Sequence, residues 1–86
     1  TRRMALRLAQ DNIVCSAIAP GAFPSEMNKE ARDHGDEVSR HVPIGRVGRD
    51  EDMAGAAVYL ASRAGDYVVG ETLVVDGGVT HARGGA

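Results

Sequence analysis

The chain has 86 residues, of which 43% are hydrophobic and 26% are charged, and its formal net charge is −2. This length leaves room for one small domain at most, and the composition is that of a folded protein rather than a disordered one. The slight negative charge and the three aromatic residues give no reason to expect a nucleic-acid partner. A single cysteine and the lack of an apolar run as long as a membrane span favour a cytoplasmic protein without membrane contact.

The residue pattern in the first half of the chain predicts a helix, a strand and a loop. Residues 1–10 are expected to be helical, because good helix formers alternate there with arginines, and the arginines at its start indicate a helix begun upstream. The apolar run 13–19 is typical of a strand buried on both faces, as in a parallel sheet. Pro20 and Gly21 end this strand and begin a loop over 20–25.

The second half predicts a lid, a helix and a second strand. Residues 25–42 are polar and interrupted by Gly35, which favours one or two short, mobile helices. A helix over 50–62 is expected, because acidic residues occupy its first turn. A second buried strand is expected over 72–75, followed by a tail over 79–86, of which the stretch 81–86 is expected to be frayed or docked only by a partner. Two strands joined by a helical crossover predict a parallel α/β unit, which needs further strands from elsewhere.

Three short motifs follow one another at a characteristic spacing: AIAPG at 17–21, PIGRVGR at 43–49 and VDGG at 75–78. In this order they resemble the C-terminal part of the classical short-chain dehydrogenases/reductases. The resemblance implies an α/β fold in which residues 1–86 form the C-terminal part of a single NAD(P)-binding, Rossmann-like, doubly wound parallel sheet. It also implies NAD or NADP as cofactor and hydride transfer to or from a small-molecule alcohol or carbonyl substrate.

The resemblance assigns cofactor binding to the loop 20–25. It implies that Pro20 and Gly21 turn the chain beneath the nicotinamide, and that the backbone of Phe23, at a position where the family usually has Ile or Val, holds the carboxamide. Ser25 matches a threonine whose hydroxyl approaches the cofactor. Each residue also has an interpretation without a cofactor: a strand-ending turn for Pro20 and Gly21, a core plug for Phe23, and a helix N-cap for Ser25.

No catalytic residue is expected within the chain. The resemblance places the catalytic serine, tyrosine and lysine upstream of Thr1. No grouping of His, Cys and Asp has metal-ligand spacing, so no metal site is expected. His34 and His41 lie in the expected lid, but exposed histidines are common and neither is assigned to the substrate. The choice between NAD and NADP depends on a residue after the second strand of the family's fold, so both remain open.

Other polar residues receive structural interpretations. Ser16 is interpreted as a packing residue, Asp76 as a turn residue, and Arg46 and Arg49 as exposed arginines of a helix-entry loop. The acids 50–52 are interpreted as partners of the helix dipole that have no acid/base partner of their own.

Two functions remain open from the sequence. The first is an oxidoreductase whose catalytic residues lie upstream. The alternative is a non-catalytic interaction module, favoured by the missing catalytic residues and by the small Gly55-Ala56 face. The resemblance implies a homodimer or homotetramer that forms through the helix 50–62 and the strand 72–75.

Overall fold

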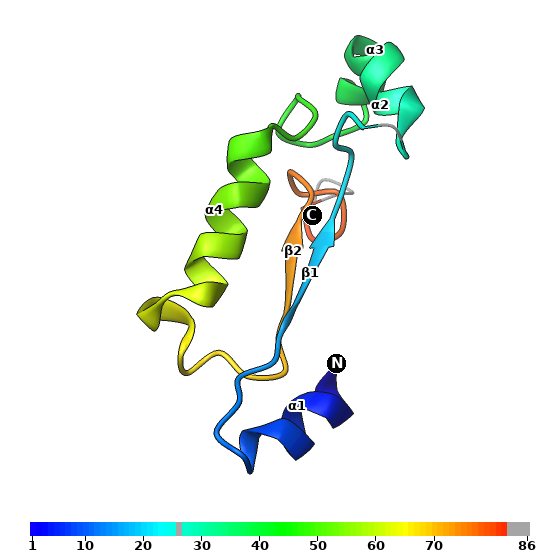
Figure 1. Cartoon of the computed structure of the whole chain (residues 1–86). Helices are drawn as coiled ribbons and strands as arrows, with labels where there is room; N and C mark the ends of the chain where they lie inside the picture. Colours follow the sequence, from blue (N-terminus) through cyan, green and yellow to red (C-terminus); the bar gives the residue numbers. More distant parts are fainter. Residues whose placement is uncertain (26, 83–86) are drawn as a thin grey trace.

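The structure is a computed structural model that describes residues 1–25 and 27–82. Its elements run from blue to red along the chain in Figure 1. They are α1 (Arg2–Ala9), β1 (Ala17–Pro20), α2 (Lys29–Asp33), α3 (Gly35–Ser39), α4 (Asp50–Ala61), the 3-10 turn η1 (Arg63–Gly65) and β2 (Thr72–Val75). Both predicted strands, both longer helices and the two short lid helices are therefore present.

The two strands form a parallel pair, as predicted. Ala17 lies opposite Thr72 and Pro20 lies opposite Val75. The Gly21 N–H extends this ladder by donating to the Val75 carbonyl at 2.9 Å. α4 connects the strands and packs along them (Figure 1). This β–α–β unit brings the carboxyl ends of both strands to one edge of the sheet.

β1 begins later than the predicted strand 13–19. Ile13 and Val14 are exposed and lie outside the ladder. The reason is the partner strand: β2 begins only at Thr72, opposite Ala17, and a strand needs backbone partners beside it. The predicted burial on both faces is also wrong for this chain, because among the described elements only α4 packs against the strands.

The lid segment folds as two short helices that pack on each other beyond the carboxyl ends of the strands (Figure 1). Asn28 begins α2, since its Oδ1 accepts a hydrogen bond from the Ala31 N–H at 3.1 Å. Gly35 begins α3, where its carbonyl accepts from the Ser39 hydroxyl at 2.6 Å. His34 lies between the two helices, so the break falls directly before the glycine at which the sequence predicts an interruption.

The end of the chain is better held than the prediction of a frayed tail. The Asp76 carboxylate accepts hydrogen bonds from the backbone N–H groups of Gly78 and Thr80, each at 3.0 Å, and from the Thr80 hydroxyl at 2.6 Å. A side chain at the end of β2 thus organises the turn, and the Ala82 N–H donates to the Gly78 carbonyl at 2.7 Å, so the predicted fraying is not found at Ala82. The remainder of the predicted tail, 83–86, lies outside the described residues.

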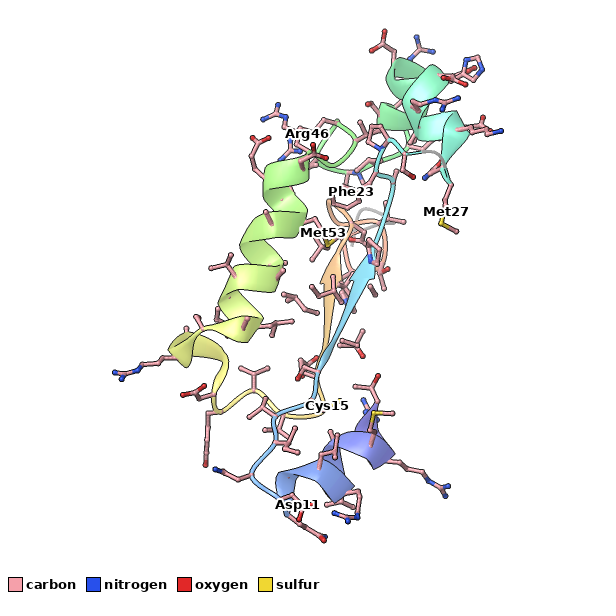
Figure 2. All side chains as sticks on the ribbon, viewed as in Figure 1. Asp11, Cys15, Phe23, Met27, Arg46 and Met53 are labelled. Carbon is pink, nitrogen blue, oxygen red and sulfur yellow. The ribbon has the colours of Figure 1, made fainter. Side chains whose placement is uncertain are left out.

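The chain buries few of its apolar side chains. In the described ranges the buried hydrophobic residues are Ala5, Ala31 and Val42. Many large hydrophobic side chains are exposed, and Figure 2 shows one of them, Met27, pointing away from the ribbon. The exposed set is Met4, Leu6, Ile13, Val14, Met27, Ile44, Val58, Tyr59, Tyr67 and Val69. No helix in the described part of the chain is long and apolar enough to cross a membrane.

Candidate functional site

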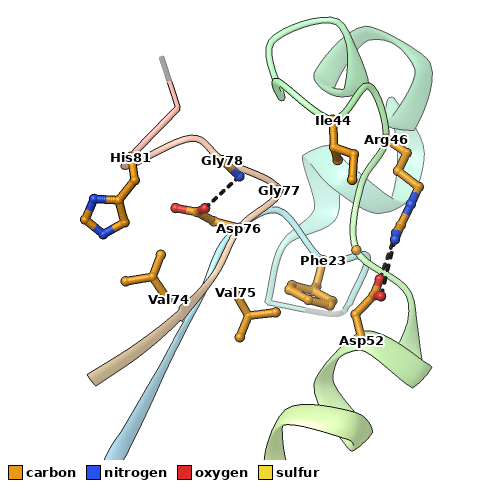
Figure 3. A pocket seen from close by; sticks show the side chains of 11 residues that line it. Phe23, Ile44, Arg46, Asp52, Val74, Val75, Asp76, Gly77, Gly78 and His81 are labelled. Carbon is orange, nitrogen blue, oxygen red and sulfur yellow. Dashed lines mark hydrogen bonds and ion pairs between the residues drawn. The ribbon is translucent and has the colours of Figure 1, made fainter. Parts of the chain in front are cut away.

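A pocket of about 380 Å³ lies at the carboxyl ends of the two strands (Figure 3). Its walls come from the loop after β1, the segment before α4 and the turn after β2. The lining residues are Phe23, Ile44, Arg46, Gly48, Asp52, Val74, Val75, Asp76, Gly77, Gly78 and His81. Open parallel sheets bind their ligands at this edge, so the pocket and the loop beside it form the candidate site.

Gly21 allows the loop 20–25 to pass close to the end of β2. A β-carbon built at Gly21 would overlap Cβ of Asp76 and lie 2.7 Å from its Cα. Because the Cα belongs to the backbone, a rotamer change could not relieve this contact. Gly21 is therefore required by the close approach of two backbones, which is a stronger constraint than a plain strand-ending turn.

Phe23 turns its ring into the pocket, where Figure 3 shows it between Val75 and Asp52. Its ring packs against the backbone of Gly48, because a β-carbon at Gly48 would overlap three of the ring carbons. The Gly48 N–H also donates to the Ala22 carbonyl at 2.8 Å. The two interpretations of Phe23, as a core plug and as a pocket residue, are compatible in this arrangement.

The other two predicted cofactor residues lie on the loop but do not line this pocket. Pro20 is the exposed last residue of β1. The Ser25 hydroxyl accepts a hydrogen bond from the Asn28 N–H at 2.9 Å. The interpretation of Ser25 as the helix N-cap is wrong, because α2 begins four residues later, at Lys29, and Asn28 is its N-cap.

Arg46 and Asp52 form an ion pair at the mouth of the pocket, 2.7 Å apart (Figure 3). The carboxylate of Asp52 also accepts from the Arg49 N–H at 2.8 Å. The hydrogen bond from Arg46, followed by the one from Arg49, lowers the pKa of Asp52 to about 2, and the same pairing raises the pKa of Arg46. The interpretation of Arg46 as a merely exposed arginine is therefore wrong. The negative charge of Asp52 interacts favourably with the dipole of α4, and its hydrogen bonds fix the segment that leads into this helix.

Asp76 has the structural role that the sequence predicts. Its hydrogen bond from the Thr80 hydroxyl, together with backbone N–H groups of the same turn, lowers the pKa of the carboxyl. Ser16 does more than pack, because its hydroxyl donates to the Val68 carbonyl at 3.0 Å. Both groups serve the fold around the strands and present no free acid or base.

Of the residues that line the pocket, only Phe23 is a predicted site residue; Ile44, Gly48 and His81 are among those that the sequence did not single out as site residues. These residues could have been predicted from the topology. The carboxyl ends of parallel strands lie at one edge of the sheet, so the segments after β2 and before α4 are expected beside the loop. The lid histidines lie elsewhere: His34 lines a separate polar hollow, and His41 is exposed. In the described ranges no group of three or more His, Cys, Asp or Glu could hold a metal ion.

Comparison with known proteins identifies the family. A family model described as enoyl-(acyl carrier protein) reductase matches residues 1–80. The chain belongs to the short-chain dehydrogenase/reductase family. It corresponds to the C-terminal portion of the family's fold, in agreement with the resemblance of the three motifs.

Curated relatives are similar along nearly the whole chain. The 2-dehydro-3-deoxy-D-gluconate 5-dehydrogenase of Bacillus subtilis is 42% identical over 81 residues, which are 91% of this chain and 32% of the relative. The 3-oxoacyl-(acyl-carrier-protein) reductase of Chlamydia pneumoniae is 38% identical over 82 residues, which are 94% of this chain and 33% of the relative. The chain thus spans about a third of the length of the curated relatives that it matches.

Solved structures confirm the fold. Pseudomonas aeruginosa RhlG, solved as an NADP active-site complex, is 38% identical with a TM-score of 0.82, over 91% of this chain and 33% of RhlG. The 3-ketoacyl-(acyl-carrier-protein) reductase of Brucella melitensis, complexed with NADH, is 29% identical with a TM-score of 0.82, over 93% of this chain and 32% of that one. The expected Rossmann-like α/β class with parallel strands is confirmed.

The resemblance implies a catalytic tyrosine that is followed four residues later by a lysine, and this chain contains no such pair. Its one lysine, Lys29, follows a serine at the four-residue distance. Tyr59 and Tyr67 are followed four residues later by an arginine and a glutamate.

Proposed function

We propose that this chain is part of an oxidoreductase that transfers a hydride between NAD(H) or NADP(H) and a small-molecule alcohol or carbonyl compound. The observation that carries the proposal is the loop 20–25. It leaves the carboxyl end of a parallel strand, and Gly21 lets its backbone pass against that of Asp76. Its position suits a ligand at the carboxyl edge of the sheet.

The residues of the loop fit a nicotinamide group. The backbone around Pro20 and Gly21 would pass beneath the ring, and the backbone of Phe23 would hold the carboxamide. The Ser25 oxygen already accepts from the Asn28 N–H, so its own hydrogen is left to donate to a carboxamide or phosphate oxygen. When bound, the cofactor supplies or accepts the hydride, while this chain positions its nicotinamide end and covers the substrate with the lid 25–42.

Proton transfer would come from residues outside this chain. A serine, a tyrosine and a lysine upstream would complete the site, with the tyrosine acting as general acid/base. The curated relatives named above act on hydroxyl or carbonyl groups of sugar acids and acyl chains, as their names state. Because the substrates in these names differ, the relatives support the proposed class of reaction, hydride transfer, and do not favour any one substrate.

A subunit interface through α4 and β2 is part of the proposal. A β-carbon at Gly55 would meet no atom within 4 Å, and Val58 and Tyr59 are exposed on the same helix. Such a face can accept a second α4 at close range in a homodimer or homotetramer. We rank the alternative function, a purely non-catalytic interaction module, behind the oxidoreductase. In such a module the tightly held loop 20–25 would have no ligand to bind.

The test is a calorimetric titration of the whole protein with NAD⁺, NADH, NADP⁺ and NADPH, with AMP as a control for adenine binding alone. We expect one oxidised and reduced pair to bind with a Kd of about 1 μM to 1 mM, the usual range for enzyme ligands. The same reduced cofactor should then be consumed when a carbonyl substrate is added. Failure of all four dinucleotides to bind would contradict the proposal and favour the interaction module.

A further inference from the structure

The contact between Phe23 and Gly48 joins two segments that are far apart in the sequence. Phe23 belongs to the loop after β1, and Gly48 belongs to the segment that leads into α4. The three atoms nearest to a β-carbon built at Gly48 are all carbons of the Phe23 ring, and all three would overlap it. Beside this contact, the Gly48 N–H donates to the Ala22 carbonyl at 2.8 Å. The loop is thus held to this segment by a backbone hydrogen bond and by a ring.

The segment on the far side of this contact is itself fixed. Arg49 follows Gly48, and its N–H donates to the Asp52 carboxylate in the first turn of α4. Asp52 also pairs with Arg46 at 2.7 Å. The segment that leads into α4 is therefore held in place. If Phe23 were displaced, the loop 20–25 would move relative to this segment, and the segment would not move with it.

Gly48 is required here by the neighbouring ring and not by its own backbone. Its φ lies outside the left-handed region, which among the described glycines is occupied by Gly45, Gly70, Gly77 and Gly78. An alanine could adopt the backbone conformation of Gly48, and the nearest obstacle to a β-carbon there is the Phe23 ring. The two residues are matched in size.

We propose that Phe23 and Gly48 form a size-matched pair that sets the position of the loop 20–25, and that Phe23 is thereby a positioning residue for the nicotinamide cofactor. This inference rests on the proposed function. It predicts that a methyl group added at Gly48 weakens cofactor binding only while the ring of Phe23 is present.

The experiment compares the whole protein with its G48A, F23A and F23A/G48A variants. The Kd of the preferred reduced dinucleotide and the midpoint of thermal unfolding are measured for each. We expect G48A to weaken binding about tenfold in the presence of Phe23 and to have no effect in the F23A background, a coupling of ordinary size for residues in contact. The KM for the dinucleotide should rise while kcat at saturation is retained.

The outcomes separate this inference from the proposed function. If G48A weakens binding equally with and without the Phe23 ring, the size-matched pair is refuted while dinucleotide binding stands. If the thermal midpoints show coupling but the dinucleotide Kd of G48A is unchanged, the positioning role is refuted. If the unmodified protein binds no dinucleotide, both proposals fail. Should G48A alone not fold, recovery of folding and binding in F23A/G48A would still support the pair.

Discussion

Two glycines at the candidate site are needed for different physical reasons. At Gly21 the obstacle to a side chain is the backbone of Asp76, whereas at Gly48 it is the ring of Phe23. A backbone obstacle can be relieved only by moving a strand end or a loop, but a ring can turn or be shortened by mutation. The two positions should therefore respond differently to the same substitution.

Gly21→Ala should destabilise the protein by about 1–3 kcal/mol, the usual cost of forcing extra atoms into a packed site. It should also weaken dinucleotide binding, because the loop 20–25 must move away from Asp76. The measurement is the free energy of unfolding by urea denaturation, together with the dinucleotide Kd.

The matched control is Gly35→Ala at the first residue of α3, where a β-carbon meets no atom within 4 Å. Replacing a helical glycine by alanine in open space should be neutral or stabilise by up to about 1 kcal/mol. Equal losses of stability in the two variants would show that the contact with Asp76 is not the cause.

At the level of elements, the carboxylate of Asp52 stabilises the start of α4. Asp52 stands in the first turn, accepts from the Arg49 N–H and pairs with Arg46, and these hydrogen bonds hold its pKa at about 2, below its ordinary value of 3.8. A lowered pKa in the folded state means that the charged form stabilises the fold. This contribution is complete above about pH 4 and is lost as the pH falls through 2.

Asp52→Asn should therefore lower the thermal midpoint at neutral pH, and the difference from the unmodified protein should shrink as the pH falls from 4 toward 2. Arg46→Met should produce a loss of its own, and the two losses should not add in the double variant, because both break one interaction. A difference that stays constant down to pH 2 would contradict the assignment of the lowered pKa to Asp52.

The sequence predicts those elements whose signals are local. β2 and α4 match their predicted ranges closely, because acids in the first turn and a short apolar run bounded by glycines are local signals. The start of β1 could not be predicted from its own apolar residues, since it depends on where β2 begins. The sequence also predicts Asp76 as a turn residue, because it stands between a strand and two glycines, but it does not predict the hydrogen bonds with Thr80.

The candidate site divides in the same way. The loop 20–25 was found from its motif, but the contact of Phe23 with Gly48 joins residues 25 positions apart and has no periodic signal. The Arg46–Asp52 pair spans the junction between a loop and a helix, where the i,i+4 rule for helical partners does not apply. Sequence reasoning thus predicts the loop 20–25 but not the residues that hold it in place.

At the scale of the whole molecule, the described residues leave two kinds of apolar surface open. One belongs to α1, where Met4 and Leu6 are exposed, and the other includes Val58 and Tyr59 of α4. The chain corresponds to about a third of its relatives' length. Exposed apolar surface of this kind is typical of faces on which other protein packs.

The central claim is that the loop 20–25 holds a nicotinamide cofactor, and hydrogen–deuterium exchange of the whole protein with and without its preferred dinucleotide tests it most directly. The account predicts slower exchange across 20–25 when the dinucleotide is bound, and unchanged exchange in the turn 63–70 at the opposite ends of the strands. Protection elsewhere with unchanged exchange across 20–25, under conditions where the dinucleotide is shown to be bound, would contradict it.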